Sequence, residues 1–343
     1  MSASRYGRGL LHLAAAVDQP DSPDAGSYAE LARLAERGGL DFVTLDDSPG
    51  RPGFDALETL SRVASATRRI GLVPTVTART GPLRAQTAVA GLDQVSGGRA
   101  GWRIDVSATG EDAPPSGPRP VAAVPRPPHG HLVRVVDVDA TGAGAAADAA
   151  GYADVVLVRA VTAVQAAAVR DRLRARADRF GRKPDSLRVL ASLLVDLGDG
   201  EHAAEPGHGG GGPRQTAQGP LYRGGPVDLA ELVAAWHADG AADGFHLVPV
   251  EPRRDLERLV NGTVALLQHR GLFRTFYPGS TLREHLGLSG STDRPADRPA
   301  DRLTERPVDR PADRPADRRT GHPVVTGATR YGKVDRTGKE TTA

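Results

Sequence analysis

Eight short apolar segments alternate with amphipathic helical patterns along most of the chain, and this alternation constrains the fold more than any other feature. Strands that alternate with helices are typical of parallel βαβ units, and eight such units close into a (β/α)8 TIM-type barrel. A doubly wound open sheet is the alternative, but no G-x-G-x-x-G sequence follows the first segment. The predicted strands are 11–17, 42–46, 70–77, 101–107, 132–138, 154–160, 187–197 and 245–250.

Two of the predicted helices carry recognisable start signals. Ser27 with Glu30 has the spacing of a capping box, and Asp55 with Glu58 has the same spacing. The apolar positions that follow repeat with helical period, which predicts one buried face on each helix. Further helices are expected at 82–94, 142–151, 162–180, 226–239 and 253–270.

Two segments look irregular. Four consecutive glycines within 201–220 predict a flexible linker, in which His202 and His208 lack further ligands at metal-binding spacing, so no metal site is expected. At the end of the chain an Asp-Arg-Pro-Ala unit recurs, and such frequent proline and balanced charge predict a disordered tail over 289–343. Residues 1–288 are therefore expected to form the barrel domain.

Composition excludes several classes of protein. The 343 residues include no cysteine, which excludes disulfides and thiolate metal sites, and the formal net charge of +2 is spread along the chain, which disfavours a nucleic-acid binder. The apolar run LLHLAAAV near the start is too short to span a bilayer. A cytoplasmic protein without a membrane or nucleic-acid partner is the expectation.

A barrel places its active site at the carboxyl ends of its strands. Asp46 to Ser48 end the second predicted strand, where a carboxylate would either accept from a ligand or cap a helix. Thr141, Gly142 and Gly144 follow the fifth strand, where a small hydroxyl-bearing turn at a helix start suits an anion. The full set of strand-end candidates is Asp18, 46–48, 75–78, 103–109, 137–144, Arg159, 196–199, Pro249 and Glu251.

Several longer segments resemble one family in its own order. They are GGLDFVTLDDS, RIGLVPTVTA, LDQVSGGRAGWRIDVSATGEDA, VPRPPHG, GAADGFHLVPV and QHRGLFRTFYPGSTLREHLGL, which together reach from about residue 10 to residue 288. The chain thus resembles the bacterial luciferase-like flavin monooxygenases, in the branch of the nitrilotriacetate, dibenzothiophene-sulfone and pristinamycin-synthase monooxygenases. The resemblance implies a (β/α)8 barrel that inserts oxygen into a small organic substrate, using reduced FMN from a separate flavin reductase.

The resemblance also implies a set of cofactor-binding residues. Asp47 corresponds to the family's acidic residue near the flavin ring, and Ser107 falls near its polar end of the fourth strand. The set is Asp47, Thr75, Thr77, Arg103, Ser107, Thr141 and Gly142. No catalytic residue is assigned by the resemblance.

The chain departs from the family pattern at three single positions. Arg103 replaces an asparagine, so a residue that donates and accepts becomes a bulky cation with donors only. Thr80 stands near the place of a histidine. Ala146 stands where an arginine should complete the phosphate turn, and its loss should weaken phosphate binding.

Two longer segments of the family look shortened. Seven prolines between 114 and 128 forbid a helix through the loop 110–130, where the family carries a helical stretch after the fourth strand. The linker at 201–220 stands in place of a second insertion after the seventh strand. These replacements predict a barrel with an open, water-accessible mouth.

Two functions follow. One is a flavin-dependent monooxygenase that uses FMN, or alternatively F420. The other is a catalytically degenerate barrel that binds flavin weakly or not at all, or serves as a non-catalytic subunit of a homo- or hetero-oligomer. His246 is expected to pack near the barrel wall, while Arg274, Tyr277 and Arg283 are expected to have structural or dimer-contact roles.

Overall fold

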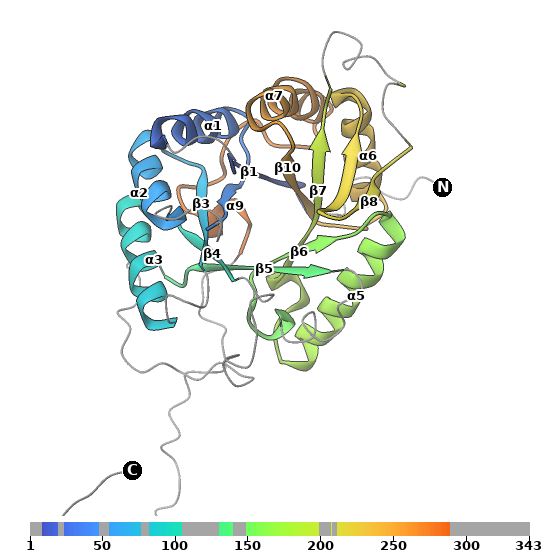
Figure 1. Cartoon of the computed structure of the whole chain (residues 1–343). Helices are drawn as coiled ribbons and strands as arrows, with labels where there is room; N and C mark the ends of the chain where they lie inside the picture. The colour runs from blue at the N-terminus through green and yellow to red at the C-terminus, as the bar shows by residue number, and fades with distance from the viewer. Residues whose placement is uncertain are drawn as a thin grey trace, which may run out of the picture. The chain divides into compact units, whose positions relative to one another are not determined.

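The strands close into a barrel, seen along its axis in Figure 1. The computed structural model describes residues 9–19, 24–47, 55–76, 82–104, 130–139, 149–198, 207 and 211–288. The eight predicted strands are all present, as β1 (His12–Ala16), β2 (Phe42–Leu45), β3 (Gly71–Val76), β4 (Gly101–Ile104), β5 (Val133–Asp139), β6 (Val155–Arg159), β7 (Arg188–Asp196) and β10 (Gly244–Pro249). They pair in parallel in the order β10-β1-β2-β3-β4-β5-β6-β7, and β10 also pairs with β7. The (β/α)8 TIM-type barrel predicted from the sequence is confirmed.

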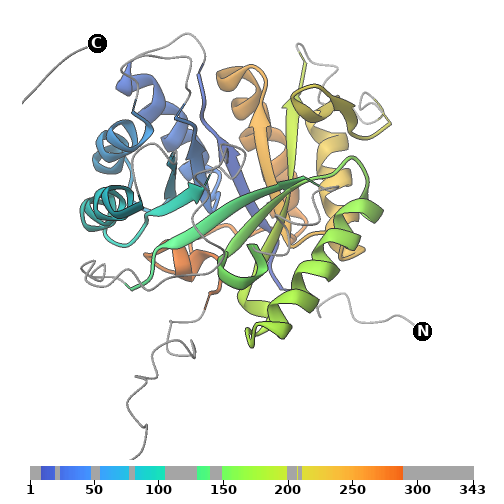
Figure 2. The same cartoon turned by 60° about the horizontal axis from the view of Figure 1, so that its bottom comes forward.

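Helices surround the barrel, with α1 to α3 on one side and α5 and α6 on the other, as Figure 2 also shows. Their apolar faces pack on the strands, so that Leu31, Leu34 and Ala35 of α1 are buried as the pattern predicted. The bounds are α1 (Ala25–Arg37), α2 (Ala56–Ala66), α3 (Pro82–Ser96), α5 (Ala163–Arg179), α6 (Pro226–Ala238), α7 (Pro252–Arg258), α8 (Ala265–His269) and α9 (Leu282–His285), with a 3-10 turn at Pro184–Ser186 and a π-helical turn at Leu259–Val264.

The two predicted helix starts had different outcomes. Asp55 caps α2, where its carboxylate accepts from the backbone N–H groups of Leu57 and Glu58. The start predicted at Ser27 is wrong, because α1 begins earlier and its cap is Asp24, which accepts from Gly26 N–H. Both sites satisfy amide groups that a helix leaves unpaired.

The linker predicted over 201–220 ends earlier than expected. Arg214–Thr216 (β8) and Gly219–Arg223 (β9) form an antiparallel hairpin, and β9 runs parallel to the end of β7. The Thr216 hydroxyl donates to the carbonyl of Gly219, whose φ of 131° favours glycine. The β6–β7 pairing ends at Ala191 of β7, and β9 pairs with β7 from Leu194 onward, so the hairpin extends the barrel wall at this end.

The closing segment after α8 seals the amino-terminal end of the barrel. Leu282, Leu286 and Leu288 pack in one cluster with side chains from inside the barrel. Arg274 donates to the carbonyl of Gly39 and to the buried carboxylate of Asp41. Of the structural or dimer-contact role predicted for this segment, these contacts within the chain support the structural one. The carboxyl-terminal end of the barrel is the end that a ligand can enter.

Three further expectations concern residues that the structure does not describe. The loop before Gly130, most of the predicted helix at 142–151 and the tail at 289–343 lie outside the described ranges. Within the described part of the chain, no helix combines the length and the hydrophobicity needed to cross a bilayer.

We expect Gly244→Ala to destabilise the barrel where β10 meets β1. A Cβ atom at Gly244 would overlap the backbone carbonyl of His12, which the strand pairing fixes. Overpacking of this kind lowers the free energy of unfolding by about 2–3 kcal/mol, which urea unfolding at neutral pH measures.

Gly91→Ala is the matched control, because a Cβ there meets open space on the exposed side of α3. A helical glycine replaced by alanine should gain about 0.5–1 kcal/mol. Equal changes in the free energy of unfolding for the two substitutions would contradict the close contact between β10 and β1.

Candidate functional site

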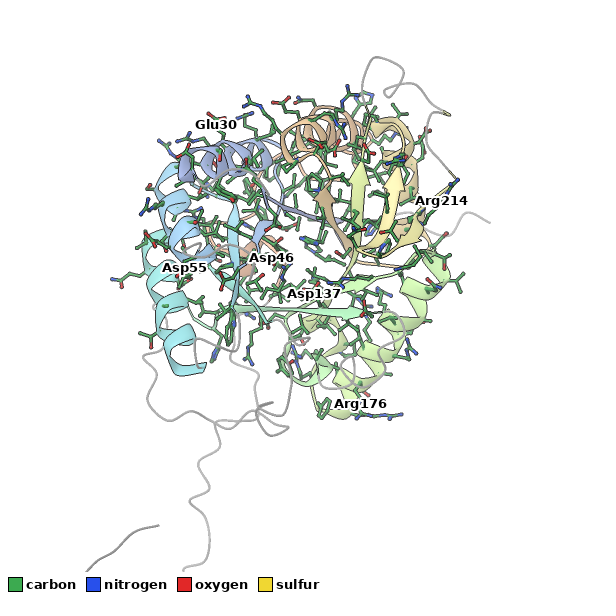
Figure 3. All side chains as sticks on the ribbon, viewed as in Figure 1. Glu30, Asp46, Asp55, Asp137, Arg176 and Arg214 are labelled. Carbon is green, nitrogen blue, oxygen red and sulfur yellow. The ribbon has the colours of Figure 1, made fainter. Side chains whose placement is uncertain are left out.

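A cavity of about 160 Å³ opens at the carboxyl ends of the strands. It is lined by side chains from β1, β2, β4, β5, β6, β7 and β10 and by the turn of the β8–β9 hairpin. The lining residues are Ala16, Asp18, Asp46, Arg103, Asp137, Arg159, Ser192, Leu194, Gln218, Gly219, Pro220, His246 and Val248. Figure 3 shows Asp46 and Asp137 near the centre of the ring of strands.

The period of two in a β-strand explains which residues line the cavity. Successive side chains alternate between the outside and the inside of a barrel. On β5, Val133 and Val135 lie in the interior cluster and Asp137 follows on the same face. On β6, Leu157 lies inside and Arg159 follows it. On each of these strands, the polar lining residue is therefore the next inward-facing side chain after the apolar ones of the barrel interior.

Arg103 is the centre of the polar network in this cavity. Its guanidinium pairs with the carboxylates of Asp46 and Asp137, the latter at 3.3 Å from Nε. The Thr75 hydroxyl, its neighbour in the β3–β4 register, accepts from Arg103 Nε at 2.9 Å and donates to Asp46. Only 9% of the Arg103 side chain is exposed, and a buried cation requires such partners.

Asp18 supports the network from β1. Its carboxylate accepts from the backbone N–H of Asp46 at 2.7 Å, which fixes the chain where β2 ends. The second cation of the cavity, Arg159, lies at the end of β6 and reaches Asp139 at 3.7 Å. This contact is long and partly exposed, so it contributes little to stability.

His246 forms the floor of the cavity and is almost completely buried. Its two ring nitrogens lie 2.9 Å from the Thr44 hydroxyl and 3.0 Å from the Ser192 hydroxyl. Burial, reinforced by the charges of Arg103 and Arg159, lowers its pKa to about 3. The ring is therefore neutral at physiological pH and holds two hydroxyl groups in place.

The predicted site residues meet different outcomes. Thr75 and Arg103 lie together in the network. Asp47 is partly buried but does not line the cavity, where its neighbour Asp46 stands instead. Thr77, Ser107, Thr141 and Gly142 lie outside the described residues, as do Thr80 and Ala146.

The sequence does not predict that His246, Ser192 and the hairpin turn line the cavity. Strand alternation could have identified His246, because Gly244, His246 and Val248 share one face of β10. It also favours Asp46 over Asp47, because Phe42 and Thr44 precede Asp46 on the inner face. Among the described residues, no group of three His, Asp or Glu side chains could hold a metal ion.

Comparison with known proteins supports the family resemblance found in the sequence. A model of the luciferase-like monooxygenase family matches residues 9–112. The EDTA monooxygenase of Chelativorans sp. BNC1 has the same fold, with a TM-score of 0.66 and 19% identity over 82% of this chain and 99% of that one. The chain is therefore similar to the luciferase-like monooxygenases, a family that typically uses reduced flavin.

The resemblance to the nitrilotriacetate branch is also confirmed. Nitrilotriacetate monooxygenase component A of Aminobacter aminovorans is 25% identical over 415 residues, covering 78% of this chain and 90% of the relative. N-acetyl-S-(2-succino)cysteine monooxygenase of Bacillus subtilis is 24% identical over 430 residues, covering 84% and 96%. Both alignments are longer than the 343 residues of this chain, so these relatives carry segments that it lacks.

The low pKa of His246 predicts a pH-dependent stability. Between an ordinary pKa of 6.5 and the folded value of about 3, the unfolded chain binds a proton that the folded protein does not. Stability therefore falls as the pH drops below about 6.5, by about 1 kcal/mol per pH unit. We expect His246→Gln to remove this contribution, as measured by urea unfolding between pH 6.5 and 5.

Burial also lowers the pKa values of the partly buried His237 and the buried His285, but they contribute equally to both proteins and cancel in the difference. His269→Gln, an exposed position at the end of α8, serves as the control and should leave the slope unchanged. An unchanged slope in His246→Gln would show that the ring is not held neutral.

Proposed function

We propose that this chain is the oxygenase component of a two-component flavin-dependent monooxygenase, which uses reduced FMN and O₂ on a small organic substrate. The observation that carries the proposal is the polar cavity at the carboxyl ends of a luciferase-like barrel. The name of one relative, component A of nitrilotriacetate monooxygenase, supports a separate partner, which we propose to be a flavin reductase.

The donor and acceptor set of the cavity suits the polar edge of a flavin ring. That edge presents carbonyl acceptors and a ring N–H donor, while Arg103 supplies N–H donors and Asp46 supplies an acceptor. The cavity volume of about 160 Å³ is below the roughly 300–1,000 Å³ typical of ligand pockets. The described residues would therefore hold only part of a flavin.

The residues have distinct roles under this proposal. Asp46 and Arg103 would orient the ring, and Thr75 would fix the geometry between them. Neutral His246 would keep the floor of the site free of an additional charge. Bound reduced flavin would supply the electrons that activate O₂, while the protein excludes water and positions the substrate.

One observation favours a second candidate, a barrel that binds flavin weakly and does not turn over. Arg103 is already neutralised by two carboxylates, so a ligand must compete with Asp46 and Asp137 for its donors. Breaking these ion pairs would leave the buried guanidinium of Arg103 without its partners, which opposes binding.

We expect the purified protein to bind reduced FMN with a micromolar dissociation constant, measured anaerobically by fluorescence or calorimetry. Thr75→Val removes the hydroxyl that bridges Arg103 and Asp46 while it preserves side-chain volume. Since this bridge would orient Arg103 and Asp46 toward the ring, we expect its loss to cost binding about as much as one hydrogen bond, about 1 kcal/mol or roughly fivefold.

Thr59→Val on α2 is the control, because the Thr59 hydroxyl donates to the carbonyl of Asp55 in its own helix turn and Thr59 does not line the cavity. If reduced FMN fails to bind at millimolar concentration, the enzyme proposal fails for the isolated chain. Binding without substrate oxygenation, when a reductase and O₂ are supplied, would support the second candidate.

A further inference from the structure

Two arginine side chains line the cavity, and their surroundings differ. Arg103 is buried and pairs with two carboxylates and a hydroxyl. The Arg159 side chain is 47% exposed, and its ion pair with Asp139 is 3.7 Å long. Asp139 is itself 65% exposed, so water competes with the pair from both sides. Arg159 is the cation of the cavity that can exchange its partner at low cost.

The position of Arg159 is fixed by the fold. It ends β6 in register with Asp139, which ends β5, so both side chains stand at the carboxyl-terminal rim. The stem of Arg159 passes beside Gly219, where an added Cβ would lie 3.9 Å from Arg159 Cδ. The hairpin turn therefore leaves room for the guanidinium at the cavity wall. The charge also reaches the interior, since Arg159 contributes, after burial and Arg103, to the lowered pKa of His246.

The other charges of the cavity limit where an anion can lie. Three carboxylates line it, those of Asp18, Asp46 and Asp137, and Arg103 is shared between the last two. An anionic group is repelled from this side. On the Arg159 side the competing carboxylate, Asp139, is exposed and does not line the cavity. An anion entering the site is thus directed to one guanidinium.

We propose that Arg159 binds an oxyanionic group of the ligand held in this cavity, with Asp139 as the partner it releases. The proposal rests on the proposed flavin-dependent function. A guanidinium binds phosphate or carboxylate oxygens through two parallel N–H donors, which gives orientation as well as affinity. The group is either the phosphate of FMN or a carboxylate of the substrate, and the experiment separates the two.

The test compares FMN with riboflavin, which has the same ring and no phosphate. Dissociation constants are measured for the wild type, Arg159→Gln and Asp139→Asn. If Arg159 binds the phosphate, Arg159→Gln should weaken FMN by about tenfold and leave riboflavin within twofold. Asp139→Asn should tighten FMN by about two- to threefold, because it removes the competing carboxylate. The two variants of one ion pair would then act in opposite directions.

The second part of the test uses succinate as a carboxylate probe and measures its binding by calorimetry. If Arg159 binds a substrate carboxylate, Arg159→Gln should abolish succinate binding and change neither flavin. Arg253→Gln is the matched control, since this 74% exposed arginine pairs with Glu30 at 3.4 Å and with Glu257 at 3.2 Å, and lies outside the cavity. It should change no binding constant.

Three results overturn the proposal: equal losses for FMN and riboflavin, no change for any probe, or Asp139→Asn weakening binding as Arg159→Gln does. Failure of the proposed function is distinguishable, because the wild type would then bind neither flavin. In that case the succinate arm still decides the role of Arg159.

Discussion

Closure of the sheet by β10, which pairs with both β7 and β1, is the constraint on which the rest of the structure depends. Closure gives each strand one inner face, and it brings the ends of strands far apart in the sequence onto one rim. The closing segment fills the opposite end with Leu282 and Leu286 and is tied there by Arg274 and Asp41. Burial alone would raise the pKa of Asp41, but His12 and Arg274 outweigh it and lower the pKa. One end is thus packed and anchored, and the cavity described above opens at the other.

At that other end, the buried charge of Arg103 organises the site. A guanidinium with little exposure must be neutralised nearby, and the inner rows of β2 and β5 supply the two carboxylates. The asparagine of the resembled family would need no such neutralisation. Arg103 therefore makes more than one contact, because it pairs with both Asp46 and Asp137, and a ligand must compete with it for these carboxylates. The polar network stabilises itself, and any ligand must match it or displace it.

The architecture could be predicted from the sequence because it rests on patterns that repeat. Eight apolar runs predicted the eight barrel strands, and Asp55 followed by Glu58 predicted the start of α2. The hairpin could not be predicted, because β8 has three residues and lies beside a glycine run. A short exposed strand buries too little to leave a clear apolar signal.

The location of the cavity could be predicted because it follows from where the strands end. The strand ends gave the correct rim, including Asp18 and Arg159, but the acidic residue was assigned to Asp47 through its likeness to a motif. The alternation of side chains selects Asp46, which continues the inner row of Phe42 and Thr44. His246 was expected at the wall and forms the floor, since its two hydroxyl partners come from β2 and β7, which only the closed barrel brings together.

Flavin binding and oxygen transfer depend on different parts of such a site. Under the proposed function, the network around Arg103 would recognise the polar edge of the ring, and the partners of Arg103 in it lie within the described residues. Oxygen transfer also requires that water be kept from the reacting groups. The curated relatives align over more positions than this chain possesses, so they contain segments that it lacks, and the family resemblance implies that such segments cover the ligand. A protein with the recognition network and less covering chain should therefore bind reduced flavin more readily than it couples O₂ to a substrate, which is why the two measurements must be made separately.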